Sequence, residues 1–439
     1  MDNQKTMPEK NWQQLVQIMK NLQLDDAPAG GSLVVYHQNK CVLDTSVGMA
    51  QKNREWRANT LSINFSTGKG VLATLVHVLV SNELLNYDTP ICDYWAEFAS
   101  NGKGDITLRQ VLSHQANLFA LNQVVSSYKD LLDWQNMLNK VATMQPFAPV
   151  NQTNNKPYAT AYSALISGWI IGGLIEKVTN LSLQQALEKY LTKPLGIADE
   201  VFFQLPQTHI GDVAQMVRNF DINAEDKPKR RIKPTLKPDS VKTMQTYAKL
   251  PSYKIWQQIL GKAHSDTAIT TAEINRIYFS PADLNIKNYT MSLLPNAKEN
   301  LDYYQPEVMQ AVIPAANCVA SAAALAKIYA MLANEGSWMG IQLINESTFD
   351  EITKIQVSGQ DAVMPADMQW RLGYHRVFNA FDRVGQLDQS FGHIGYNGSV
   401  AWCNPSNGLA VAYVHNYDTT LLNDIRAFAI TEAVIDCLA

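Results

Sequence analysis

The chain has 439 residues, of which 46% are hydrophobic and 17% charged, so it can bury a large core as one large domain or two interleaved ones. Its 36 basic and 40 acidic residues leave a formal charge of −4, which gives no reason to expect binding to nucleic acid or to an anionic membrane. The five cysteines are widely spread and form no Cys-x-x-Cys pair, which argues against a disulfide framework and against a zinc site.

The first elements expected along the chain are an amphipathic helix and a β-hairpin. Apolar residues recur at helical spacing over residues 9–22. Residues 32–37 and 41–44 have the pattern of two antiparallel strands with a polar turn between them. The N-terminus has no apolar segment typical of a secretory signal, and no run approaches the length of a membrane span. We therefore expect a cytoplasmic protein.

The most informative stretch runs from Asn64 to Gly70, where a strand-like run becomes a buried, helix-like run that starts at Ser66. Residues three apart share a helix face, so the Ser66 hydroxyl and the Lys69 amine can come within hydrogen-bond reach. A lysine in apolar surroundings can lose its proton near neutral pH and accept the proton of the serine. A helix N-terminus also offers backbone NH groups to a developing oxyanion. The stretch predicts a nucleophilic serine, with an ordinary helix cap as the alternative.

Two other Ser-x-x-Lys patterns, at Ser100 and Ser126, lack this context. Ser100 lies in a glycine-containing polar loop, and Ser126 is placed to cap the helix that follows it. We expect both serines to be inert.

The middle of the chain, up to about residue 200, is expected to be mainly helical. Thr107 is placed to cap a short helix, and residues 162–178 form a long apolar run at helical spacing. Residues 221–245 differ, because they hold a basic run and repeated Lys-Pro pairs. Prolines in a polar setting favour a solvated surface loop over a contact with an acidic partner.

The C-terminal part predicts a helix, a β-meander and a final helix. The first helix covers residues 321–332 and would return the chain towards the sheet. Three strand-like runs follow at residues 391–396, 399–403 and 409–415, the last two joined by a polar turn. An apolar helix over residues 421–438 would cover one face of this meander.

Three short motifs occur in order along the chain. They are Phe65-Ser66-Thr67-Gly68-Lys69, then Tyr162-Ser163-Ala164 at the start of the long apolar helix, then Gly392-His393-Ile394-Gly395-Tyr396 at the start of a strand. In this order they resemble the three motifs of the serine β-lactamase and penicillin-recognising superfamily. The resemblance is closest to its class C β-lactamase-like branch and, there, to the class VIII carboxylesterases. The second motif of that branch begins with tyrosine, and its third can carry histidine in place of lysine.

The resemblance covers nearly the whole chain and implies its fold class. That class is α/β (α+β): an antiparallel β-sheet flanked by helices, with a mainly helical domain inserted. The sheet domain would be built from both chain ends, residues 1–65 and 305–439. The inserted domain would span residues 66–304 and contain the basic segment near 221–245.

The resemblance also implies roles for the motif residues. Ser66 matches the acylated nucleophile, and Lys69 matches the amine that helps to deprotonate it. Tyr162 matches the tyrosine that serves as general base or passes a proton to the leaving group. His393 stands where the third-motif cation usually lies, and Gly395 would keep that strand open to substrate. A serine ester intermediate splits one hard hydrolysis into two easier steps, so the set is chemically coherent.

Further residues are expected around these. The oxyanion hole would combine the backbone NH groups of Ser66 and Tyr396. Asn317 would line the substrate pocket, and His114 is expected to fix local structure. Ala164 stands at the third place of the second motif, where the β-lactamases have an asparagine that contacts the substrate amide.

Two departures from the family pattern favour an ester over a β-lactam. Ala164 lacks the asparagine amide, and His393, with a reference pKa of about 6.5, is mostly neutral at pH 7. We therefore expect a serine hydrolase that cleaves small carboxylic esters through an acyl-enzyme on Ser66. The alternatives are β-lactamase or D-alanyl-D-alanine peptidase activity, and a non-catalytic binding protein that retains the fold.

Other chemistries are not indicated. The sequence has no Gly-x-Ser-x-Gly elbow, no His-Glu-x-x-His, no phosphate-binding loop ending in Gly-Lys-Ser/Thr and no Gly-x-Gly-x-x-Gly. No cofactor and no metal are implied. The expected partner is a small-molecule ester or β-lactam-like substrate, with no nucleic acid and no membrane, and the sequence predicts no oligomeric state.

Overall fold

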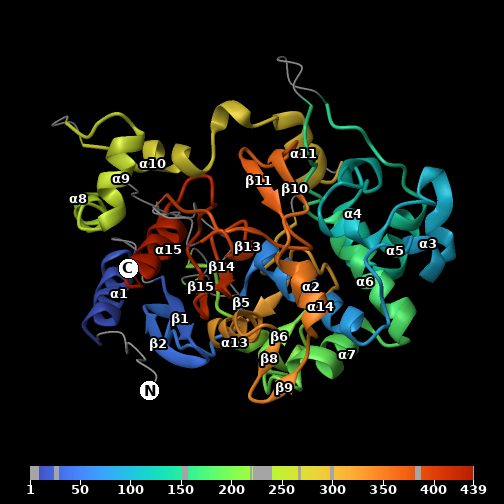
Figure 1. The fold of residues 1–439 in the computed structure, drawn as a ribbon, viewed down its shortest axis with the longest axis horizontal. Helices are drawn as coiled ribbons and strands as arrows, with labels where there is room; N and C mark the ends of the chain where they lie inside the picture. The colour runs from blue at the N-terminus through green and yellow to red at the C-terminus, as the bar shows by residue number, and fades with distance from the viewer. Residues whose placement is uncertain are drawn as a thin grey trace.

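The computed structural model describes residues 9–23, 29–150, 157–217, 220, 240–264, 268–296, 301–380 and 387–438. Most of the basic segment expected as a surface loop, residues 221–239, lies outside these ranges. The described chain forms an eight-stranded antiparallel sheet with helices packed around it and a further group of helices to one side (Figure 1). The predicted fold class is confirmed.

The main sheet joins the two ends of the chain. Its strand order is β10-β11-β12-β13-β14-β15-β1-β2, with antiparallel neighbours throughout. The strands are β1 (Gly31–His37), β2 (Lys40–Val47), β10 (Val357–Gln360), β11 (Asp367–Trp370), β12 (His375–Arg376), β13 (Phe391–Ile394), β14 (Val400–Asn404) and β15 (Leu409–His415). The predicted hairpin and meander are both present, and β10, β11 and β12 extend the sheet beyond the strands predicted from the sequence.

Both faces of the sheet are buried, as two neighbouring residues of β15 illustrate. Ala410 packs into the core that contains α13 (Ala322–Ala333). The next residue, Val411, packs into the core that contains α1 (Glu9–Asn21) and α15 (Arg426–Asp436). Successive side chains of a strand point to opposite faces, so a strand covered on both sides is apolar at every position. These three helices correspond to helices predicted from the sequence, although α15 begins later than expected.

Helix α2 (Gly68–Ser81) lies at the centre of the molecule and is buried along its first three turns. It packs against α6 (Ile166–Thr179) as well as against α13 and β13. The sequence predicts that α2 starts at Ser66, but Ser66 lies in a 3₁₀ turn (Phe65–Thr67) just before it. The positive φ of Phe65, 48°, turns the chain sharply at this point and delays the helix.

Two groups of further helices pack against these elements. One group, α3, α4, α5 and α7, packs around α6. The other includes α8 and α9, which lie against α1 and α15 respectively (Figure 1), so part of the predicted inserted domain contacts helices that flank the sheet. The predicted domain boundaries therefore stay a prediction.

The further elements are α3 (Ile91–Tyr94), α4 (Leu108–Leu112), α5 (Trp134–Thr143), α7 (Leu183–Leu187), α8 (Val241–Tyr247), α9 (Pro251–Ile259), α10 (Thr271–Tyr278), α11 (Ile286–Leu293), α12 (Pro306–Gln310), α14 (Glu346–Thr353), β3 (Met49–Gln51), β4 (Arg54–Glu55), β5 (Ser62–Ile63), β6 (Val201–Phe202), β7 (Val319–Ala320), β8 (Ser337–Trp338) and β9 (Ile341–Gln342).

The close approach of α2 to the residue before β7 gives a testable prediction. A Cβ atom at Gly68 would overlap the Cβ atom of Cys318, so Gly68→Ala should lower the free energy of unfolding by about 1–3 kcal/mol, the usual cost of overpacking. Urea unfolding measures this change. Gly104→Ala is the matched control, because a Cβ atom there meets nothing within 4 Å. Equal stability of the two variants would contradict the packing described here.

Candidate active site

Ser66 is held on a turn that buried polar side chains fix from both ends. Before it, the amide of Asn64 donates to the carbonyl oxygens of Ser62 at 3.0 Å and Ala320 at 2.9 Å. After it, the hydroxyl of Thr67 donates to the carbonyl oxygen of Ser399 at 2.7 Å. These bonds tie the turn to β5, β7 and the start of β14. They hold Phe65 in its positive-φ conformation, a backbone state that persists only when its surroundings fix it.

Three of the predicted site residues meet at one oxygen atom. The Lys69 amine donates to Ser66 Oγ at 2.8 Å and to the carbonyl oxygen of Ala315 at 2.7 Å. The Tyr162 hydroxyl donates to the same Ser66 Oγ at 3.0 Å. The Lys69 amine also lies 5.2 Å from the centre of the Tyr162 ring. The structure therefore places the phenol of Tyr162 beside the hydroxyl and the amine of a motif that begins 96 residues earlier, at Ser66.

Burial shifts the proton affinities of this group in opposite directions. Burial lowers the pKa of Lys69 well below the usual value of a lysine amine. Burial also raises the pKa of Tyr162 above its usual value, and the hydrogen bond to Ser66 offsets only part of that rise. Burial therefore favours the neutral amine of Lys69 over the ammonium ion, and it favours the protonated phenol of Tyr162.

The backbone of the second motif is held by side chains from three other segments. The NH of Tyr162 donates to Asp361 Oδ1 at 3.2 Å, and the NH of Ser163 donates to His114 Nδ1 at 3.3 Å. The NH of Ala164 donates to the hydroxyl of Ser292 at 3.1 Å. Residues 162–165 therefore precede the helix, which begins at Ile166 rather than at the predicted position.

Of these supporting residues, His114 has the local structural role expected from the sequence. Burial, together with nearby Lys69 and His375, lowers the pKa of His114 to about 3, so its Nδ1 accepts from Ser163 as a neutral ring. Asp361 and Ser292 carried no signal in the sequence, since neither belongs to a motif. Their contacts depend on tertiary packing alone.

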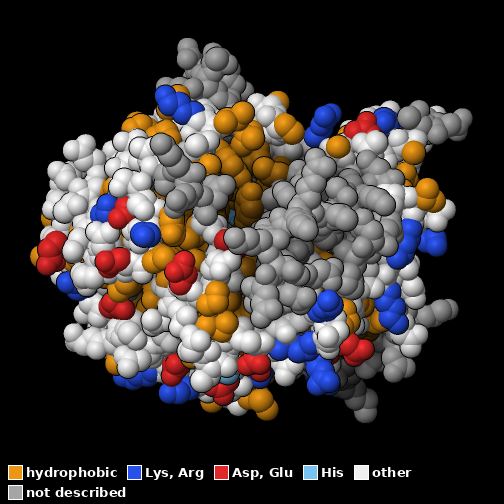
Figure 2. All heavy atoms as spheres, turned by 180° about the vertical axis from the view of Figure 1, so that it is seen from behind, with side chains coloured by type: hydrophobic (Ala, Val, Ile, Leu, Met, Phe, Trp, Pro, Cys, Tyr) orange, Lys and Arg blue, Asp and Glu red, His pale blue; other side chains and the backbone are white. Residues whose placement is uncertain are grey.

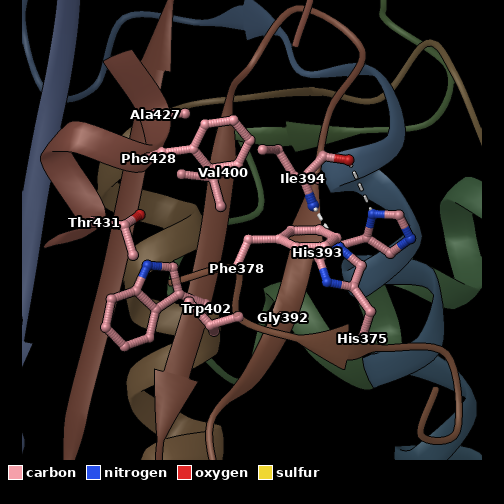
Figure 3. A pocket seen from close by; sticks show the side chains of 11 residues that line it. His375, Phe378, Gly392, His393, Ile394, Val400, Trp402, Ala427, Phe428 and Thr431 are labelled. Carbon is pink, nitrogen blue, oxygen red and sulfur yellow. Dashed lines mark hydrogen bonds between the residues drawn. The ribbon is translucent and has the colours of Figure 1, made fainter. Parts of the chain in front are cut away.

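His393 is buried and neutral. Its Nδ1 lies 3.1 Å from the carbonyl oxygen of Ile394, which can only accept, so Nδ1 carries the proton and Nε2 is an acceptor. The neighbouring His375 accepts the NH of Ile394 on Nε2 at 3.2 Å, and the two ring centres are 4.9 Å apart (Figure 3). Burial, with His375 and Lys69 nearby, lowers the pKa of His393 well below its usual value. The third motif therefore presents no cation here.

Of the other residues predicted for the site, some line the cavity next to Ser66 and others do not. Tyr396 and Ala164 line the same cavity as Ser66. Gly395 has a different role from the expected one, because a Cβ atom there would overlap the carbonyl oxygen of Asn64 behind the nucleophile turn. The absence of a Cβ atom at Gly395 therefore leaves room for the turn that carries Ser66, rather than for substrate.

Asn317 is not brought to the cavity. Its side chain accepts the NH of Ile313 at 3.1 Å and donates to the carbonyl oxygens of Val308 at 2.8 Å and Ala311 at 2.7 Å. Both ends of the amide are therefore occupied by the segment that leads to Ala315, the acceptor of Lys69. This position makes Asn317 a support for the site.

A cavity of about 700 Å³ opens in front of Ser66. Figure 2 shows a hollow on this side of the molecule, with hydrophobic side chains gathered around it. Its walls come from α11, β11, the segment 301–304 and the segment 418–422. Within the described residues there is no group of three or more metal-ligating side chains. Nor does that part of the chain hold a helix both long and apolar enough to cross a membrane.

The sequence as a whole matches one protein family. The model of the family described as Beta-lactamase matches residues 13–434. The chain belongs to the beta-lactamase family.

Individual beta-lactamase-family relatives agree with this assignment. The esterase/beta-lactamase LipL of Mycobacterium tuberculosis is 28% identical over 392 residues, which cover 88% of this chain and 77% of LipL. The crystal structure of a family VIII carboxylesterase matches with a TM-score of 0.70 and 25% identity over 99% of both chains. A penicillin-binding protein homologue from Caulobacter crescentus shares the fold, with a TM-score of 0.68 and 24% identity over 100% of both chains. The chain is thus a hydrolase of the beta-lactamase family.

The shared hydrogen bonds to Ser66 predict that Lys69 and Tyr162 act as one unit in this family member. Lys69→Ala and Tyr162→Phe should each lower kcat by about a hundredfold or more, the usual contribution of a general acid or base. The double variant should lose little more than the worse single variant, because groups that act together are strongly non-additive. Steady-state kinetics on an aryl ester measures all three.

Lys103 provides the matched control for these variants. It is also buried, but its amine donates to the carbonyl oxygens of Ser100, Ala142 and Met144. Lys103→Ala should therefore lower stability without a comparable loss of kcat. A double variant of Lys69 and Tyr162 that lost the full sum of the two single effects would rule out a shared proton relay.

Proposed function

We propose that this protein is a serine hydrolase that cleaves carboxylic esters through an acyl-enzyme on Ser66. The observation that carries the proposal is the buried Lys69 amine 2.8 Å from Ser66 Oγ, next to a cavity wide enough for an organic substrate. The esterase/beta-lactamase LipL and the family VIII carboxylesterase support the assignment, since both are named for ester hydrolysis. The small esters expected from the sequence belong to the same proposal.

In the first step, Ser66 Oγ attacks the ester carbonyl while Lys69, as a neutral amine, takes the hydroxyl proton. Backbone NH groups of Ser66 and Tyr396 stabilise the oxyanion. The C–O bond to the alcohol then breaks, and Tyr162 gives its proton to the departing alkoxide as Lys69 returns one to Tyr162. In the second step, water attacks the acyl carbonyl and loses a proton to Lys69. The bond between the acyl carbon and Ser66 Oγ then breaks, and Lys69 returns the proton to Ser66 Oγ, so an acid is released and Ser66 is regenerated.

The polar groups around Ser66 favour an ester over a β-lactam. A β-lactam normally presents a carboxylate and an amide, and its recognition benefits from a cation on the third motif and an amide on the second. His393 is neutral and Ala164 has no polar side-chain atom. β-Lactam hydrolysis remains the second candidate, because the name of LipL combines both activities.

The proposal predicts covalent labelling at a single residue. A fluorophosphonate should add one mass increment to the protein, on the peptide that contains Ser66, because Lys69 and the turn activate that hydroxyl. Intact-protein and peptide mass spectrometry measure the increment. Labelling that persists in Ser66→Ala would show that Ser66 is not the nucleophile.

Ser100 and Ser126 are the internal controls for this experiment. The hydroxyl of Ser100 donates to the carbonyl oxygen of Glu97, and the hydroxyl of Ser126 lies against Asp130 Oδ2. The Lys103 amine donates to the backbone carbonyl of Ser100, but neither of the two hydroxyls contacts a lysine amine in the hydrogen bonds that the structure describes. Ser100→Ala and Ser126→Ala should therefore be labelled as strongly as the unaltered protein.

Substrate preference tests the choice between ester and β-lactam. We expect good turnover of aryl esters and slow or absent hydrolysis of a chromogenic cephalosporin at pH 7. A charge-assisted hydrogen bond is worth about 1.5–3 kcal/mol, or roughly tenfold to a hundredfold in affinity. The variant His393→Lys with Ala164→Asn should therefore shift the ratio of kcat/KM towards the cephalosporin. Faster turnover of the cephalosporin than of the ester by the unaltered protein would show that the ester assignment is wrong.

A further inference from the structure

The cavity in front of Ser66 is much larger than a short ester requires. Ligand sites of about 300–1,000 Å³ enclose most of a drug-sized molecule, and this cavity measures about 700 Å³. An acetyl or butyryl group would occupy only a small part of it. The rest of the volume must be explained by another part of the substrate.

The walls of this cavity are mainly apolar. They include Leu165, Leu293, Leu294, Met364, Met368 and Leu421. Aromatic side chains add to them, among them Tyr289, Tyr303 and Trp370. An apolar wall stabilises a bound substrate only where an apolar group of that substrate displaces water from the wall.

The charges in the cavity exclude an anionic substrate group. Two carboxylates, Asp302 and Asp418, belong to the lining, whereas none of the described lining residues is a lysine or an arginine. Lys69 is buried behind Ser66, with its amine bonded to Ser66 and Ala315. His393 also contributes to the wall and accepts, rather than donates, at Nε2. A substrate carboxylate would therefore meet two carboxylates and, among the described lining residues, no cationic partner.

We infer that the physiological substrate is an uncharged ester with a large apolar group, such as a medium- to long-chain acyl or alkyl chain or a fused-ring system. This inference rests on the proposed ester hydrolysis at Ser66 and names the class of ester. It extends the expectation of small esters from the sequence, because the sequence gives no measure of cavity size. The apolar group can belong to the acid or to the alcohol of the ester, and a separate ester series tests each possibility.

The first experiment measures kcat/KM for two ester series on the unaltered protein. One series lengthens the acyl chain of an aryl ester from two to twelve carbons, and the other lengthens the alcohol of a fixed acid. In the series that occupies the cavity, kcat/KM should rise about two- to fourfold per added methylene, or at least about sixtyfold over the six methylenes between four and ten carbons. A flat or falling profile beyond four carbons in both series would overturn the inference.

The second experiment tests the charge. Two aryl esters of equal chain length are compared, one ending in a methyl group and one in a carboxylate. The neutral ester should have a kcat/KM at least tenfold higher, because the cavity offers the carboxylate no cation. Equal rates would show that the substrate need not be uncharged. Neither result depends on the variants of Ser66. Loss of this inference is therefore distinguishable from loss of the proposed function, which fails if Ser66→Ala retains labelling or activity, or if the unaltered protein turns over the cephalosporin faster than the ester.

The third experiment assigns the chain-length preference to the cavity wall. Leu294 directly follows α11, lines the wall and is 48% exposed, so Leu294→Asn should fold normally and lower kcat/KM for a ten-carbon ester about three- to tenfold. The four-carbon ester should change less than twofold. Ile286→Asn is the matched control, because Ile286 is exposed on the same helix but does not line the cavity. Identical chain-length profiles for these two variants would place the apolar group of the substrate elsewhere.

Discussion

The structure depends on a primary amine held inside the protein without a carboxylate beside it. Lys69 is 6% exposed, and its hydrogen-bond acceptors are a hydroxyl and a carbonyl oxygen. A buried ammonium ion is costly, and the cost is lowered when the amine gives up its proton. The burial that makes the charged form of Lys69 costly therefore also lowers its pKa and favours the neutral amine, which can accept a proton.

The fold supplies every surface that this amine needs. Helix α2 carries Lys69, the segment held by Asn317 presents the carbonyl of Ala315, and the loop before α6 presents Tyr162. These segments lie far apart in the sequence. Pairing of β5 with β7 brings the chain before Ser66 next to the segment after Ala315, and α6 packs against α2. Gly68 and Gly395 let the nucleophile turn approach its neighbours closely, so small residues are as necessary to the site as polar ones.

The sequence predicts the parts of this arrangement that have a local pattern. Periodicity is enough for α1, α13, the N-terminal hairpin and the C-terminal meander, because each buries a regular apolar face. The two-residue strand β12 has too short a pattern to be predicted. It links the rest of the sheet to β11, which in turn pairs with β10. Motif order places Ser66, Lys69 and Tyr162, but it gives no information on Asp361 or Ser292, whose contacts arise only in the folded chain. For Asn317, sequence position alone could not separate a residue that lines the cavity from one that supports its wall.

The neutral third motif also has a consequence for the base. A permanent cation at position 393 would repel the ammonium form of Lys69 and lower its pKa further. The neutral ring of His393 exerts no such repulsion. With His393 uncharged, burial is the cause of the lowered pKa of Lys69. The base then depends on how well water is excluded from the front of Ser66, which lines the apolar cavity. An apolar substrate group that fills this cavity would exclude that water, so substrate binding and activation of the nucleophile would reinforce each other.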